Sequence, residues 1–183
     1  MNKKYSQQAV KPLVRGSSIY LREAGLEDSA FILELRTNPK KSMHISKTKE
    51  DIQAQHAFMK RYFLSTSDFY FIMCNWQGER LGTVRIYNTH SDSFCWGSWL
   101  IATGSPASVA LESAVLVYEF AFLSLHYRVA KFDVRKENAS VVRFHEKFGA
   151  TRVGSDSRNL FFELQVEQYL GSRHKFKRFF QPG

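Results

Sequence analysis

Cysteine and proline are both scarce in this sequence of 183 residues. It contains two cysteines, Cys74 and Cys95, and four prolines. Two cysteines cannot build the several disulfides that stabilise a small secreted scaffold, so we expect both to be small core residues in a reducing compartment. The cysteines and the six histidines also lack the spacing of zinc ligands, so no metal site is predicted.

The chain also lacks a long apolar run that is free of charge. Its most apolar stretch, residues 109–125, contains Glu112 and Glu119, and two carboxylates in so short a segment disfavour a membrane span. Residues 1–12 are basic and polar, without the apolar centre of a secretory signal. We therefore expect a soluble, cytoplasmic protein in which residues 106–125 form a buried helix.

Acidic residues are outnumbered by basic ones. There are 26 Lys and Arg against 17 Asp and Glu, a net charge of +9, which favours anionic partners such as phosphorylated small molecules, nucleic acid or a membrane surface. Apolar residues make up 44% and aromatics 15%, enough for a core, which excludes disorder of the whole chain. The length fits one domain, residues 17–170, between a flexible leader at 1–16 and a basic aromatic tail at 171–183.

The apolar periodicity predicts a mixed α/β domain of the α+β kind. Strands are expected at 18–22, 69–76, 80–87, 94–102, 129–134, 151–154 and 160–166, and helices at 26–38, 49–64, 106–125 and 138–148. The three strands of 69–102 form an antiparallel meander. A crossover through the helix at 106–125 then places strands 94–102 and 129–134 nearly parallel.

The first candidate site is the loop that precedes the helix at 106–125. Ser105 is a natural N-cap and Pro106 suits the first helical position. Small residues around this helix start would let a phosphate approach its free N–H groups and the positive end of its dipole. The loop has neither a P-loop lysine nor a G-x-G-x-x-G motif, and an ordinary capped helix is the alternative interpretation.

The second candidate site is the short helix at 138–148, which we expect Gly149 to terminate. Val141, Phe144, His145 and Phe148 recur at helical spacing and share one inward face. A buried imidazole can act as a general acid or base, because its ordinary pKa lies near neutrality. A core histidine bonded to a carbonyl is the alternative.

Together these segments resemble the GNAT acetyltransferase superfamily. The run from Asn138 to Ala150, which contains His145-Glu146-Lys147-Phe148-Gly149, is similar to the family signature Asn-x₆-Tyr-Glu-Lys-Leu-Gly-Phe, and the resemblance covers about residues 17–168. It implies a mostly antiparallel, twisted sheet that is splayed between the strands at 94–102 and 129–134, with helices on both faces. It also implies acetyl-CoA as the donor and a primary amine as the acceptor.

The resemblance further implies which residues hold acetyl-CoA. The expected donor-binding residues are Trp99, Leu100 and Ile101 on the strand, Ser105, Ser108, Val109 and Ala110 at the pyrophosphate loop, and Asn138, Val141 and Phe144 on the short helix. The family pattern Gln/Arg-x-x-Gly-x-Gly/Ala is matched only at Ala110. His145 stands where many members place a tyrosine that protonates the leaving thiolate, and it is the predicted catalytic residue.

For the acceptor, the resemblance points to the loop between the first two helices and to the meander turn. The predicted acceptor-binding residues are Arg36, His44, Tyr87 and His90, with His90, Asp92 and Tyr87 as candidate proton acceptors. Lysines of the same loop would form a rim for an anionic acceptor such as a nucleotide-linked amino sugar, or would simply be solvated.

Two alternatives to a sugar acceptor stay open. One is acetylation of a protein N-terminus, such as that of a ribosomal protein. The other is a non-catalytic basic module, in which Phe176, Phe179 and Phe180 of the tail would bind nucleic acid or an anionic membrane. We do not favour nucleic acid as a partner, because a frayed chain end, or packing of the tail on a second subunit of a homodimer, explains the same residues.

Overall fold

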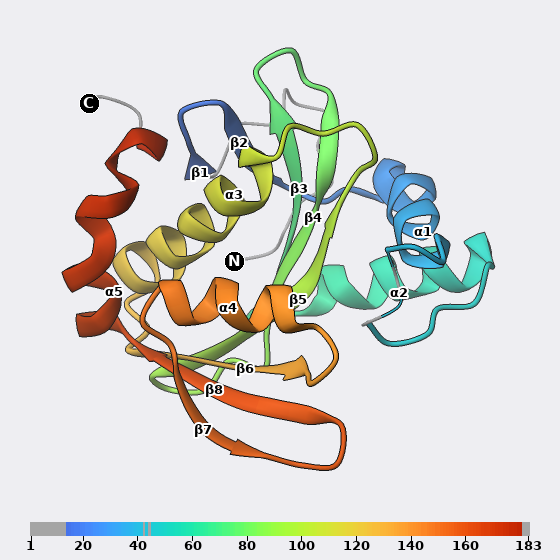
Figure 1. The fold of residues 1–183 in the computed structure, drawn as a ribbon. Coiled ribbons are helices and arrows are strands. Elements are labelled where there is room, and N and C mark those ends of the chain that lie inside the picture. Colours follow the sequence, from blue (N-terminus) through green and yellow to red (C-terminus); the bar gives the residue numbers. More distant parts are fainter. Residues whose placement is uncertain (1–13, 42, 44, 181–183) are drawn as a thin grey trace.

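The computed structural model describes residues 14–41, 43 and 45–180 (Figure 1). Its strands form one sheet in the order β1-β2-β3-β4-β5-β6-β8-β7. They are β1 (Val14–Arg15), β2 (Ile19–Glu23), β3 (Phe69–Asn75), β4 (Arg80–Tyr87), β5 (Ser93–Ile101), β6 (Val129–Arg135), β7 (Thr151–Ser155) and β8 (Asn159–Gln165). Neighbouring strands run antiparallel except β5 and β6, which are parallel as predicted.

Helices cover both faces of this sheet (Figure 1). They are α1 (Ser29–Thr37), α2 (Ile52–Leu64), α3 (Ser108–Tyr118), α4 (Ala139–Lys147) and α5 (Val166–Arg173). Successive side chains of β3 point to opposite faces: Ile72 packs in one core cluster with Met59 of α2, and Phe71 packs in the other with Val115 of α3. Among the described residues, no helix is long and apolar enough to cross a membrane.

The sheet splays apart between β5 and β6, as the family resemblance implies. The two strands pair only at Ser93 with Val129 and at Phe94 with Ala130. Beyond these positions, β5 pairs only with β4 in the part of the chain that the structure describes. The edge of β5 that faces β6 therefore leaves main-chain N–H and C=O groups without a strand partner.

A β-bulge at Ser98 interrupts the pairing of β5 with β4. Thr83 pairs with Leu100 and Arg85 with Gly97, so β5 carries one extra residue in this interval. Ser98 has a φ of +48°, and its carbonyl accepts a hydrogen bond of 3.0 Å from the Thr83 hydroxyl. The bulge turns Ser98 out of the regular alternation of the strand.

Three predicted helix starts lie ahead of the observed α-helices. The predicted start at residue 26 is a separate 3-10 helix, Leu26–Asp28, that precedes α1. Helix α2 begins at Ile52 rather than near residue 49, because Asp51 is the N-cap and its carboxylate accepts from the Gln53 and Ala54 amides at 2.8 and 3.2 Å. Helix α3 begins at Ser108 rather than at 106. Its N-cap is Ala107, which makes no side-chain cap bond, whereas the predicted cap, Ser105, donates instead to the carbonyl of Leu81.

The last turns of the predicted helix at 106–125 form a π-helix. After Tyr118 the chain continues as the π-helical segment Glu119–Ser124, where the Leu125 amide donates to the Phe120 carbonyl five residues back. Helix α4 is as predicted, and Gly149 follows it with a φ of +94°.

Both ends of the chain contain structure that the apolar pattern did not predict. Val14–Arg15, within the predicted leader, pair with β2 as strand β1. The segment after β8 forms α5 and then the 3-10 helix His174–Phe179, and both Phe176 and Phe179 are buried in the core. Residues 1–13 of the leader and 181–183 of the tail lie outside the described residues.

Candidate functional site

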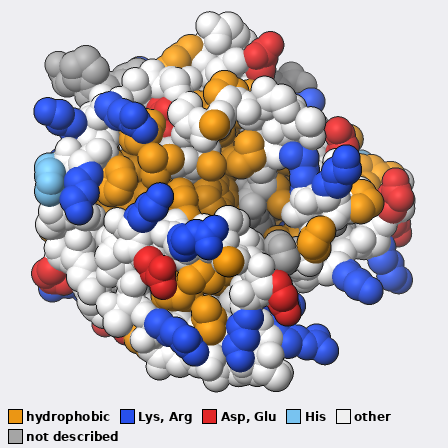
Figure 2. Space-filling model, in the orientation of Figure 1, with side chains coloured by type: hydrophobic (Ala, Val, Ile, Leu, Met, Phe, Trp, Pro, Cys, Tyr) orange, Lys and Arg blue, Asp and Glu red, His pale blue; other side chains and the backbone are white. Residues whose placement is uncertain are grey.

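A cavity of about 170 Å³ opens where β5 and β6 diverge. It lies between the free edge of β5, strand β6 and the first turns of α4. Its lining residues are Lys41, Ile45, Trp96, Gly97, Ser98, Trp99, Phe132, Asp133, Val134, Arg135, Asn138, Val141 and His145. Figure 2, in the orientation of Figure 1, shows apolar side chains gathered at the centre of the molecule's visible face, with Lys and Arg side chains around them.

Two buried nitrogens in this cavity have no hydrogen-bond partner among the described residues. They are Nδ1 of His145 and Nε1 of Trp96, whose rings lie 5.3 Å apart. Burial among aromatic rings, including Phe132 at 4.2 Å, lowers the pKa of His145 to about 3. The imidazole is therefore neutral at physiological pH, which excludes an imidazolium as the resting form.

The rim of this cavity offers main-chain and amide groups. Lys41 donates from Nζ to the carbonyl of Ile101, at the end of β5. Asn138 is the N-cap of α4, and its Oδ1 accepts from the Val141 amide at 3.4 Å and from the Ser140 hydroxyl at 3.0 Å. The free strand edge and the two orphan nitrogens suit an extended chain that carries amide groups of its own.

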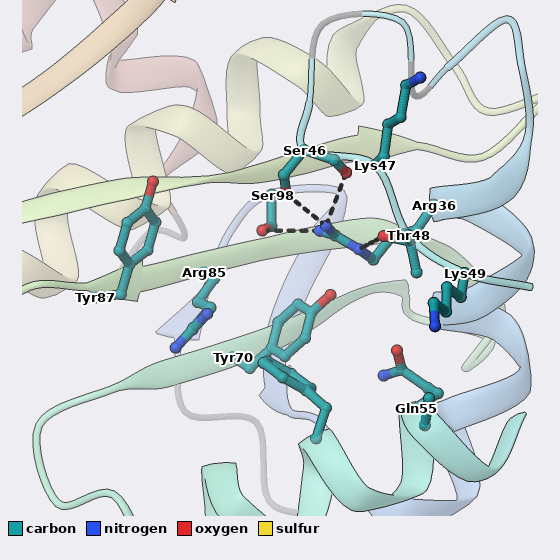
Figure 3. Close-up of a pocket in the computed structure, with 12 residues that line it drawn as sticks. Arg36, Ser46, Lys47, Thr48, Lys49, Gln55, Tyr70, Arg85, Tyr87 and Ser98 are labelled. Carbon is teal, nitrogen blue, oxygen red and sulfur yellow. Dashed lines mark hydrogen bonds between the residues drawn. The ribbon is translucent and has the colours of Figure 1, made fainter. Parts of the chain in front are cut away.

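A second cavity, of about 440 Å³, lies beside the first between α2, the loop after α1 and the sheet (Figure 3). Arg36 on α1 crosses its upper wall. The guanidinium donates to the Thr48 hydroxyl at 2.8 Å, to the Ser98 hydroxyl at 3.2 Å and to the Ser46 hydroxyl at 3.0 Å. The remaining lining residues are Lys47, Lys49, Ala54, Gln55, Phe58, Tyr70, Arg85 and Tyr87.

The lining of this cavity is cationic. Arg36, Lys47, Lys49 and Arg85 are among its residues, and no Asp or Glu of the described chain is. Arg85 pairs with Asp68 outside the lining, while its guanidinium lies over the rings of Phe58 and Tyr87 at 5.3 and 5.2 Å. The excess of positive charge favours an anionic ligand.

The two cavities meet at the β-bulge, since Ser98 lines both of them. Beside it, a Cβ added at Gly97 would lie 2.9 Å from the hydroxyl of Tyr87, so only glycine allows this close approach. Burial raises the pKa of Tyr87, and the charges of Cys95 and Asp133 raise it further. The phenol therefore stays protonated near neutrality, which argues against its predicted role as a base.

The comparisons with known proteins identify the family. An acetyltransferase (GNAT) domain family matches residues 18–151. The chain belongs to the GNAT acetyltransferases. Enzymes of this family are N-acetyltransferases that depend on acetyl-CoA, which identifies acetyl-CoA as the co-substrate. The splayed sheet is the feature that the family resemblance implied.

Several solved GNAT structures resemble this one. Apo FdhC, described as a nucleotide-linked sugar GNAT, is 32% identical, with a TM-score of 0.84 over 94% of this chain and 100% of its own. The spermidine N-acetyltransferase of Vibrio cholerae, solved with CoA and spermine, is 16% identical, with a TM-score of 0.76 over 84% of this chain and 99% of its own. A GNAT acetyltransferase of Bacillus anthracis is 14% identical, with a TM-score of 0.71 over 84% and 98%. No curated protein matches the sequence.

The structure brings only some of the predicted donor-binding residues to the β5–β6 cavity. Trp99, Asn138, Val141 and the predicted catalytic residue His145 line it. Phe144 packs against Trp99 with ring centroids 4.9 Å apart, and Ile101 lies at the rim. Leu100 is buried, and the pyrophosphate-loop group lies at the start of α3, outside both cavity linings; this group is Ser105, Ser108, Val109 and Ala110.

Of the predicted acceptor residues, Arg36 and Tyr87 line the second cavity. His90 and Asp92 are exposed in the turn before β5, away from both linings, because this turn lies at the end of the sheet where β5 and β6 still pair. His44 lies outside the described residues.

The sequence interpretation missed the other main wall residues, which are Ser98, Gln55, Tyr70 and Arg85. Gln55 carried a weak signal, because it lies at the helical spacing of Met59 and Tyr62. Arg85 carried none, because its face of β4 also contains Thr83 and Tyr87.

Proposed function

We propose that this GNAT enzyme transfers the acetyl group of acetyl-CoA to the amino group of a nucleotide-linked sugar. The observation that carries the proposal is the cationic cavity that meets the β5–β6 cavity at Ser98. A nucleotide-linked sugar carries two phosphates, whose negative charge suits Arg36, Lys47 and Lys49. The 32% identity with FdhC, a nucleotide-linked sugar GNAT, supports the same acceptor class.

In this proposal the donor occupies the β5–β6 cavity. The free edge of β5 pairs with the amides of its pantetheine arm. Asn138 can donate a hydrogen bond from Nδ2 to the same arm, because its Oδ1 is already used to cap α4. The thioester then lies near the bulge, where the amine reaches it from the second cavity. The amine nitrogen attacks the thioester carbon, the C–S bond breaks, and the departing sulfur receives the proton that the amine loses.

His145 assists the departing sulfur as a neutral hydrogen-bond donor. Its low pKa argues against the cationic acid, whereas a neutral imidazole still carries one N–H, and Nδ1 has no partner among the described residues. Such assistance accounts for part of the rate only, because a positioned group contributes about 10²–10⁴-fold, whereas alignment of the reactants contributes more.

A polyamine acceptor fits the second cavity less well. Spermidine is a polycation, and the cavity presents Arg36, Lys47, Lys49 and Arg85 without a lining carboxylate among the described residues. The likeness to the spermidine acetyltransferase is at 16% identity and concerns the fold alone. A peptide N-terminus carries a single positive charge and would find no counter-charge in this lining either.

The decisive experiment is a panel of acceptors with acetyl-CoA, in which thiol release and acetylated product are both measured. We expect turnover with TDP- or UDP-linked amino sugars and little with spermidine or with peptides that have free N-termini. Turnover with spermidine or peptides alone would overturn the assignment of the acceptor.

A further inference from the structure

The side chain of Gln55 is buried and incompletely paired at the floor of the cationic cavity. The residue is 5% exposed and lies in the first turns of α2, and its Nε2 has no hydrogen-bond partner among the described residues. Figure 3 shows the amide beneath the cavity, below the end of the Lys49 side chain and on the side opposite Arg36. A buried primary amide with an unpaired N–H group is uncommon, because most buried polar groups are hydrogen-bonded.

The position itself calls for an apolar residue. Gln55, Met59 and Tyr62 are the buried residues of α2, at the spacing i, i+4 and i+7, so they form its inward stripe. Tyr62 satisfies its hydroxyl with Glu23 at 2.8 Å and with the Tyr70 amide at 2.9 Å. Gln55 is the member of this stripe with an unsatisfied donor, so packing alone does not explain the amide.

Orphan polar groups gather at the two cavities. Six buried side-chain atoms lack a partner in the described part of the chain, and four of them belong to cavity-lining residues. Those of Trp96 and His145 belong to the β5–β6 cavity, and those of Gln55 and Arg85 to the cationic one. These residues line the cavities, but the orphan atoms themselves are shielded from solvent. A ligand would therefore supply the missing partner of Gln55 after the side-chain amide turns toward the cavity.

We propose that the amide of Gln55 recognises the uncharged part of the acceptor by donating a hydrogen bond to one of its oxygens. That oxygen is a sugar hydroxyl or a pyrimidine carbonyl. The inference rests on the proposed acceptor class and adds a residue that selects among its members. Arg36, Lys47 and Lys49 attract the phosphates of any nucleotide, whereas Gln55 discriminates by geometry.

The physical basis of this selection is the cost of an unmade hydrogen bond. A ligand that lacks the oxygen leaves Nε2 as unpaired as it is in the free enzyme, while a ligand that carries it gains the bond. The selectivity therefore equals the value of the one bond gained, because the amide is unpaired in the free enzyme as well. The charged rim cannot supply this discrimination, because phosphate attraction is common to all nucleotides.

The substitution Gln55→Met in the full-length enzyme tests the proposal, because methionine keeps the volume and removes the amide. We expect KM for the nucleotide-linked amino sugar to rise about 2–12-fold, the value of one neutral hydrogen bond, with kcat nearly unchanged. We also expect the melting temperature of the free enzyme to rise by about 2–4 °C, because a buried unsatisfied group is removed. The matched control is Gln53→Ala, an exposed glutamine on the same turn of α2, which should alter neither quantity.

Two competitors identify the source of the oxygen. TDP carries the base and phosphates without the amino sugar, and the amino sugar 1-phosphate carries the sugar without the base. If Gln55→Met weakens inhibition by TDP as much as it raises KM, the partner is the base carbonyl. If it weakens inhibition by the sugar phosphate instead, the partner is a sugar hydroxyl.

The results separate this inference from the acceptor class. If the unmodified enzyme acetylates no nucleotide-linked amino sugar, the proposed function is wrong and the inference fails with it. If it does so and Gln55→Met keeps the original KM, or loses melting temperature without a change in KM, Gln55 is a packing residue and only the inference is overturned.

Discussion

The guanidinium of Arg36 donates a hydrogen bond of 3.2 Å from Nη1 to the hydroxyl of Ser98, 62 positions further along the chain. This contact joins α1 and the loop that follows it to the β-bulge at which the two cavities meet. Through Ser46 and Thr48 the same guanidinium also holds the wall of the cationic cavity. Arg36 therefore holds the wall of the cationic cavity as well as contributing charge to it.

Replacement of Arg36 by lysine separates its geometry from its charge. Lysine keeps the positive charge and loses the planar fork. We expect kcat/KM for the nucleotide-linked sugar to fall about 10–100-fold, the value of a charge-assisted hydrogen bond. The control is Arg61→Lys on an exposed turn of α2, which should leave steady-state kinetics unchanged. Full activity of Arg36→Lys would show that charge alone is sufficient at this position.

The buried imidazole of His145 makes the stability of the fold depend on pH. Its pKa is about 3 in the folded protein and about 6.5 when unfolded, so the unfolded chain binds a proton first as the pH falls. Between pH 6.5 and 3 this residue lowers the free energy of unfolding by up to about 1.4 kcal/mol per pH unit. Above pH 6.5 it has no such effect.

We expect His145→Phe to remove that part of the pH dependence. Urea unfolding at pH 7 and at pH 5 measures the difference in free energy for the original chain and for the variant. His174→Phe, at an exposed histidine, is the control and should keep the original slope. If the free energy of unfolding changed equally with pH in all three proteins, His145 would have the same pKa in the folded and the unfolded chain.

The contact between Gly97 and Tyr87 can be tested by adding a methyl group. In Gly97→Ala the new Cβ would lie 2.9 Å from the Tyr87 hydroxyl, so the phenol must move away from the junction of the cavities. We expect a higher acceptor KM, and we expect Tyr87→Phe to relieve the clash in the double variant. Kinetics of the four proteins give the coupling, expected to be about 0.5–3 kcal/mol. Additive effects would show that the two side chains do not interact.

The basic aromatic tail is a further point of test. Phe176 is 8% exposed and stacks on Phe148, with ring centroids 4.5 Å apart. We expect Phe176→Ala to lower the free energy of unfolding by about 3–5 kcal/mol, measured by urea unfolding. Leu170→Ala, at a 46% exposed leucine of α5, should cost much less. If Phe176→Ala unfolds like the original chain and instead loses affinity for nucleic acid, the alternative of a basic binding module gains support.

Much of the fold can be predicted from local pattern alone. Strand β4 was predicted with its observed bounds, and β3, β5, β6 and α4 to within a residue or two at each end, because alternation and helical spacing are properties of neighbouring residues. The inward face of α4 also follows from spacing, so the burial of His145 was predictable. Helix α5 was missed, because its apolar residues are few and gain their burial from the core that it covers.

The cationic cavity shows what local pattern cannot supply. Its wall combines Arg36 of α1, Gln55 of α2, Arg85 of β4 and Ser98 of β5, which meet only once the sheet is paired in register. The bulge at Ser98 exists because β5 has one residue more than β4 between two paired positions. The sequence of either strand alone does not contain this information. Chain-local signals therefore defined the elements, their order and the family signature at 138–150. The divergence of β5 from β6, the low pKa of His145 and the unpaired amide of Gln55 arise from packing, because each depends on which distant groups exclude water or fail to supply a partner.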